Sequence, residues 1–131
     1  MRAELKSLFS MYVLGDLASW SPPTRAFNIS LMLFVGLEDD NRFDAFDLEI
    51  CSLNWLQENV ATEDIAFLNH LLIVPTFDYP FLWNSLSQKC REHTGDDWPD
   101  IAMQIDLWAE WEFRGLALSR RAPSSCERGA E

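Results

Sequence analysis

Apolar and polar residues alternate along two neighbouring stretches of the chain. Every second position is apolar from residue 27 to residue 35, and again from residue 46 to residue 51. A period of two predicts β-strands with one buried face. The residues between the two stretches, Glu38-Asp39-Asp40-Asn41, are typical of a turn, so together they predict an antiparallel hairpin. Residues 3–9 and the apolar run 68–74 predict two further strands.

Helical spacing replaces this alternation in the second half of the chain. Apolar residues that recur every three or four positions predict a helix with Pro80 in its first turn and Gly95 at its end. A second apolar stripe, on residues 98–108, predicts another helix. One of the two aspartates just before this stripe, Asp96 or Asp97, suits its N-cap.

The order of these elements predicts the fold class. Ser52 is expected to cap a short helix after the hairpin, and alternation around Glu110 predicts a last short strand. The order β-β-β-α-β-α-α-β indicates an α+β domain: a mostly antiparallel sheet of four to five strands with two to three helices packed on one face. We expect this single domain to occupy residues 1–118. Residues 119–131 lack periodicity and are expected to form a flexible C-terminal tail.

Acidic residues dominate the charge of the chain. It has 21 acidic and 10 basic residues among 131, which gives a net charge of −11. Between Asp44 and Glu112 the only basic residues are Lys89 and Arg91. This charge repels phosphate backbones and anionic lipid headgroups, so we expect no direct binding to nucleic acid or membranes. A basic protein is the partner that the charge favours, and solubility alone is the competing explanation.

Neither a membrane segment nor an export signal is evident in the sequence. No apolar run approaches the roughly 18 residues that a membrane helix needs. Near the N-terminus, Glu4 interrupts the region that a signal peptide would make basic, and no clear cleavage site follows. We therefore expect a cytoplasmic protein.

The sequence lacks the patterns of catalysis and metal binding. It has no GxSxG, HExxH, P-loop or GxGxxG motif. Its cysteines, Cys51, Cys90 and Cys126, are scattered without CxxC spacing, so they fit neither a disulfide framework nor a zinc site, and the first two suit buried positions. His93 beside two aspartates falls short of a metal-ligand set, and His70 within an apolar strand suits the core. We therefore predict no catalytic residue, no cofactor and no metal.

The helix predicted over residues 98–108 has a second face that mixes apolar and acidic residues. On a helical wheel, the residues opposite the apolar stripe are Asp100, Met103, Leu107 and Glu110. Such a face suits docking against a protein, because an apolar anchor provides affinity while charges fix the register. Two alternatives stay open: another element covers Met103 and Leu107, or the helix ends before Leu107.

Two segments of the chain resemble one known family. In the first, Phe46–Leu56, a strand runs into a Cys-Ser-x-x-Trp-Leu helix start. In the second, Gly95-Asp96-Asp97-Trp98 is followed by Trp111-Glu112-Phe113, after which Arg114 and Gly115 replace the family's acids and aromatic residue. In their order and spacing these motifs resemble the Imm8 family of bacterial immunity proteins, over roughly residues 1–116. The resemblance implies a small α+β protein that binds and neutralises a cognate toxin and is not an enzyme.

We therefore predict an immunity protein whose acidic patch covers the basic active or substrate-binding surface of a toxin such as a nuclease. The predicted contacts lie at the hairpin tip, at the start of the last helix and on the outward face of the last strand. They are Glu38, Asp39, Asp40, Asp96, Asp97, Asp100, Met103, Leu107, Glu110 and Glu112. The motif residues Trp55, Trp98 and Phe113 are expected to fill the core, because contacts with the partner must differ between toxin pairs.

Two other classes of function compete with this prediction. The first is an acidic intracellular adaptor, or a self-associating protein, with no relation to toxins. The second is a small hydrolase, which would need His70 or His93 beside carboxylates in a deep cleft. The sequence predicts no oligomeric state.

Overall fold

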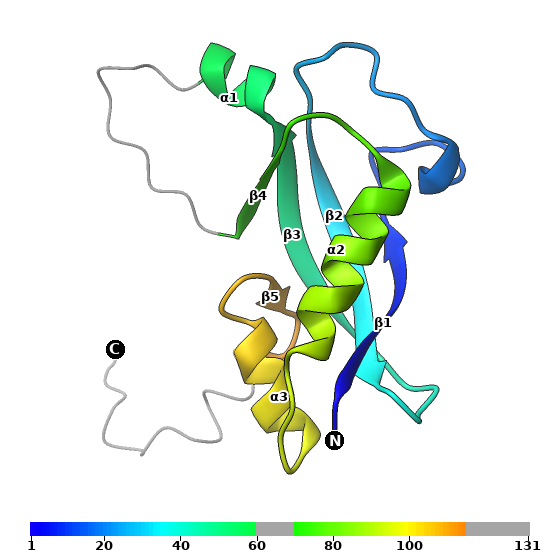
Figure 1. Ribbon diagram of the computed structural model, residues 1–131, viewed down its shortest axis with the longest axis vertical. Coiled ribbons are helices and arrows are strands. Elements are labelled where there is room, and N and C mark those ends of the chain that lie inside the picture. Colours follow the sequence, from blue (N-terminus) through cyan, green and yellow to red (C-terminus); the bar gives the residue numbers. More distant parts are fainter. Residues whose placement is uncertain (60–69, 115–131) are drawn as a thin grey trace.

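Five strands and three α-helices make up the parts of the chain that the computed structural model describes, residues 1–59 and 70–114 (Figure 1). In chain order the elements are β1 (Ala3–Phe9), a 3₁₀ helix (Leu17–Ser19), β2 (Asn28–Leu37), β3 (Asp44–Ser52), α1 (Leu53–Asn59), β4 (Leu71–Val74), α2 (Tyr79–Arg91), α3 (Trp98–Ile105) and β5 (Glu110–Trp111). Apart from the 3₁₀ helix, this order is the predicted one. The α+β class is confirmed.

The strand β3 organises the sheet because it has neighbours along both edges. On one edge it pairs antiparallel with β2, which in turn pairs antiparallel with β1. On the other edge, β5 pairs antiparallel opposite Phe46 and Asp47, and β4 pairs parallel opposite Glu49–Ser52. The two short strands thus follow one another along β3. Among the described strands only the β3–β4 pair is parallel, which confirms the mostly antiparallel sheet.

Side-chain caps determine where the helices begin. The carboxylates of Asp78 and Asp97 each accept a hydrogen bond from a backbone N–H in the first turn of α2 and α3, at 3.1 and 2.9 Å. The Ser52 hydroxyl accepts one from the N–H of Trp55 at 3.2 Å, as predicted for α1. Figure 1 shows α2 lying across the sheet, with α3 near its C-terminal end.

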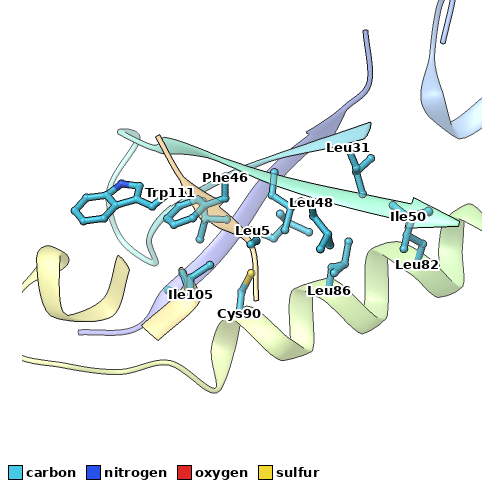
Figure 2. Packing of buried hydrophobic residues seen from close by; sticks show 14 of the residues in the cluster. Leu5, Leu31, Phe46, Leu48, Ile50, Leu82, Leu86, Cys90, Ile105 and Trp111 are labelled. Atoms are coloured by element: carbon cyan, nitrogen blue, oxygen red, sulfur yellow. The ribbon is translucent and has the colours of Figure 1, made fainter. Parts of the chain in front are cut away.

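The core fills the space between one face of the sheet and the helices α2 and α3 (Figure 2). Alternate residues of β2 and β3 enter it, which confirms the period of two: Ile29, Leu31, Leu33, Val35, Phe46, Leu48 and Ile50. The helices contribute Leu82, Leu86, Cys90, Ile101, Ala102 and Ile105. Both Cys51 and Cys90 are buried as predicted, and burial raises the pKa of the Cys90 thiol to about 12, which keeps it protonated and unreactive.

The helix α3 is shorter than the sequence predicts. It ends at Ile105, with Asp106 as its C-cap. The chain then turns tightly, because the backbone N–H groups three and four residues after Ile105 both donate to its carbonyl at 2.9 Å. The helical face that would carry Leu107 and Glu110 therefore does not form, and the alternative that the helix ends before Leu107 is confirmed. Leu107 lies in the turn after the helix, and Glu110 lies on β5.

Four residues with ring side chains differ in how far they enter the fold. His70 precedes β4 instead of lying within it, because its φ of 52° is in the left-handed region and cannot continue an extended strand. Trp98 packs against the core as expected. Phe113 is 43% exposed and packs perpendicular to the ring of Trp111, so its predicted place in the core is wrong. Trp55 is half-buried on α1, a helix with no buried residue.

Some predictions concern residues outside those described. They are the start of the strand predicted over 68–74, the domain end at residue 118, the tail over 119–131, and Cys126. Of the helices within the described ranges, none has the length and apolar character to cross a membrane.

Candidate functional site

A single carboxylate joins the three parts of the chain that carry the predicted contact residues. Asp44 opens β3, and its Oδ2 accepts hydrogen bonds from the indole N–H groups of Trp98 at 2.7 Å and Trp111 at 2.9 Å. Phe46 packs between these rings, edge-on to Trp98 and stacked on Trp111. The start of β3 next to the hairpin turn, the start of α3 and the strand β5 are therefore held together at one end of the sheet.

Backbone hydrogen bonds bring the hairpin tip and the loop before α3 to the same place. The carbonyl of Arg2 accepts from the N–H of Glu38 at 3.0 Å, and the carbonyl of Met1 accepts from the N–H of Gly95 at 3.1 Å. The first residues of the chain thus lie between the two segments (Figure 1). A hollow of about 640 Å³ opens here, lined by Met1, Arg2, Leu37, Glu38, Asp39, Asp40 and Thr94.

We call this end of the sheet the acidic end, defined by Glu38, Asp39, Asp96, Asp97 and Asp100. All five residues are exposed. The side chain of Asp97 also caps α3 by accepting from the N–H of Asp100 at 2.9 Å. Two groups of predicted contacts, far apart in the sequence, therefore share one surface.

The other predicted carboxylates take part in local contacts or lie beside this end. Asp40 pairs with Arg42, whose Nη2 lies 2.6 Å from Oδ2, and these hydrogen bonds lower the pKa of Asp40 to about 2. On the other side, Glu112 Oε2 accepts from the backbone N–H of Ala45 at 2.5 Å. Glu110 is exposed on β5, directly opposite Asp47 of β3.

The two predicted apolar contacts do not form one face. Met103 is half-buried and packs against the core, so the domain itself covers much of it, which was one of the alternatives. Leu107 is 84% exposed in the turn after α3. Of these two residues, Leu107 is therefore the one that offers a substantial apolar contact to a partner.

Both histidines are occupied by structural hydrogen bonds. The indole N–H of Trp108 donates to His93 Nε2 at 3.0 Å, so the ring proton lies on Nδ1, which faces Gln104 Oε1 at 3.2 Å. His93 thus links the end of α2 to α3. His70 Nε2 lies 2.9 Å from the carbonyl oxygen of Asp106. Neither histidine has the carboxylate partner that the hydrolase alternative needs, and no group of three potential metal ligands occurs in the described parts of the chain.

Asp44 and Asp106 organise this end of the sheet, although no motif of the sequence marks them. Asp106 is buried; its Oδ1 accepts from the N–H of Trp111 at 2.9 Å, and its Oδ2 lies 3.1 Å from Arg114 Nε. Arg114, the departure from the family pattern, thus has a structural partner. A signal for Asp44 is present in the sequence, because the indole N–H groups of packed tryptophans need hydrogen-bond acceptors and an aspartate begins the strand against which both pack.

These features define an acidic α+β domain in which both histidines make structural hydrogen bonds and the thiols of Cys51 and Cys90 are buried. Residues 3–115 match the family description "Imm8: Immunity protein 8", and no curated protein or solved structure matches the chain. The chain belongs to the Immunity protein 8 family. It is therefore a toxin-neutralising protein that acts by binding and not as an enzyme, and its partner is a cognate toxin.

Proposed function

We propose that the chain neutralises its toxin by occlusion, in the cytoplasm. In this mechanism the acidic end, extended by Glu110 and Glu112 on β5 and by Leu107, covers the basic active or substrate-binding surface of the toxin. A nuclease fits this mechanism best among toxins, because an enzyme that binds nucleic acid needs a basic surface. The immunity protein then occupies the place of a polyanion.

The observation that supports occlusion is the convergence of the hairpin tip and the start of α3. Their five exposed carboxylates are held on one surface by backbone bonds to Met1 and Arg2. Opposite potentials speed the encounter of two proteins, and an acid at the rim acts mainly on the rate of association. An acid that becomes buried against a basic partner contributes more, and its removal costs about 2–5 kcal/mol.

Co-expression with the toxin domain of the adjacent reading frame tests the function itself. Rescue of growth together with co-purification is the expected result. The mechanism is tested by titration calorimetry at about 50 and 300 mM salt, where occlusion predicts weaker binding at the higher salt.

Variants of the acidic end test its part in the interface. Glu38→Gln/Asp39→Asn is expected to weaken binding about tenfold, mainly through slower association. The matched control Asp16→Asn/Glu58→Gln removes the same charge elsewhere, and it keeps the helix cap at position 16 because Asn caps as well as Asp. If variants of the carboxylates at the hairpin tip, at the start of α3 and on β5 all bound the toxin like the wild type, with the same salt dependence, the mechanism of occlusion by this surface would be wrong. The neutralisation of the toxin by this chain would not be refuted by that result.

A further inference from the structure

The sheet has a second face, turned away from α2 and α3. Residues that alternate with the core residues line this face, and the strand register places four of them in one row. Phe9 of β1 pairs with Met32 of β2, Met32 pairs with Asp47 of β3, and Asp47 pairs with Glu110 of β5. We call this surface the open face, defined by the row Phe9–Met32–Asp47–Glu110 and the neighbouring Glu49.

One half of the row is apolar and accessible. Phe9 is 48% exposed, and Met32 beside it is half-buried. Next to this pair, Phe34 of β2 packs against Phe43 of the hairpin, with ring centroids 5.0 Å apart, and Phe43 is 52% exposed. Exposed aromatic side chains that gather on one surface are typical of protein interfaces.

The other half of the row consists of like charges. Asp47 and Glu110 lie directly opposite one another in an antiparallel pair, an arrangement that destabilises a sheet. Glu49, two residues further along β3, points to the same side and is exposed. The four ion pairs of the described residues involve none of these three acids. The lysine of β1, Lys6, is held by Glu4 and the carbonyl of Leu37.

We propose that the open face is a second contact surface for the toxin, and that it binds a segment presenting a lysine or arginine beside an apolar residue. The cation lies between Asp47 and Glu110, where it relieves their repulsion, and the apolar neighbour packs on Phe9 and Met32. This inference rests on the proposed function, since it takes the toxin as partner. A second copy of this chain is a poor occupant, because its acids would face the same acids.

Affinity for the toxin domain tests the charged half. Asp47→Asn/Glu49→Gln is expected to weaken binding about tenfold or more at low salt, and the matched control Asp16→Asn/Glu58→Gln should stay within about twofold of wild type. Wild-type affinity in the charged variant would overturn the inference. The inference would also be overturned if sedimentation velocity showed that the free wild-type chain associates with itself and that Asp47→Asn/Glu49→Gln abolishes this association.

The apolar half is tested in the same assay. Phe9→Thr retains a residue with good strand propensity and is expected to weaken binding about tenfold, whereas Leu14→Ser, which removes a fully exposed leucine from a loop, should not. If variants of the acidic end weaken binding while Phe9→Thr and Asp47→Asn/Glu49→Gln do not, occlusion stands and the open face is excluded. The reverse pattern supports the open face and removes the acidic end from the interface.

The stability of the free chain separates binding from folding. If Asp47 and Glu110 repel one another, Asp47→Asn raises the midpoint of urea unfolding while it lowers affinity for the toxin. The rise in the midpoint disappears when Asp47→Asn is made in a chain that already carries Glu110→Gln. A residue that merely supported the fold would lower both. A lower midpoint for Asp47→Asn, or the same effect in both backgrounds, would overturn the like-charge argument on which the proposal depends.

Discussion

Asp44 offers the sharpest test of how the acidic end is held together. Its Oδ2 accepts two indole hydrogen bonds, at 2.7 Å from Trp98 and 2.9 Å from Trp111. A hydrogen bond to a charged group contributes about 1.5–3 kcal/mol net, so two would give about 3–6 kcal/mol. The bonds share one oxygen and Trp98 is only half-buried, so water replaces part of the loss. We expect Asp44→Ala to lower the free energy of unfolding by about 2–4 kcal/mol.

Urea unfolding followed by tryptophan fluorescence measures this change. Asp44→Asn keeps a carbonyl oxygen as acceptor but loses the charge, so its expected loss is smaller, about 1 kcal/mol. Trp98→Phe removes one donor, and the double variant with Asp44→Ala should be less destabilised than the sum of the two single variants. A loss below about 1 kcal/mol for Asp44→Ala, or full additivity, would refute the idea that this carboxylate links α3 and β5 to the hairpin.

Three further predictions concern the hairpin and the core. A Cβ on Gly36 would lie 2.0 Å from the carbonyl oxygen of Arg42, so Gly36→Ala should destabilise the chain by about 2 kcal/mol or more in urea unfolding, and a neutral effect would contradict the tight tip. Arg42→Ala should raise the pKa of Asp40 from about 2 toward 3.8 in an NMR titration. In the wild type, the ion pair contributes its full stability above the pKa that Asp40 has in the unfolded chain, and this stability is lost as the pH falls through about 2. If the pKa of Asp40 is the same in Arg42→Ala as in the wild type, the pair does not form in solution. In a chain whose other cysteines are serine, Cys90 should react with a thiol reagent at pH 8 only on unfolding, and fast labelling of the native state would contradict its burial.

The sequence predicts the fold better than it predicts the surface. The period of two in β2 and β3 identifies their buried residues, since a strand that exposes one face must alternate. Pro80 in the first turn of α2 and the aspartates before α3 likewise identify the helix starts, because proline suits a first-turn position and a short side chain satisfies a free backbone N–H group there. Such signals are local, so they can be read without knowing the tertiary structure.

The end of α3 shows where local signals fail. The apolar stripe continues to Trp108, yet the helix stops at Ile105, because Asp106 holds the N–H of Trp111 and starts a turn into β5. The partner in this contact belongs to β5, which pairs with β3, so no helical wheel reveals it. Glu110 likewise does not belong to the helical wheel, because it lies on β5 opposite Asp47, in the short strand that the alternation around Glu110 predicts.

The residues by which the family is recognised mainly hold the acidic end together. Asp97 caps α3, Trp98 and Trp111 bond to Asp44, and Glu112 bonds to Ala45. An immunity protein must keep its scaffold while its contact surface is matched to one toxin. Residues outside the motifs, such as Phe9 on the open face and Glu38 and Asp39 at the hairpin tip, can change without disturbing those bonds. Selectivity between toxins should therefore transfer with Phe9 of the open face and with Glu38 and Asp39 of the hairpin tip, whereas a substitution of Trp98 or Trp111 should alter stability and leave the choice of toxin unchanged.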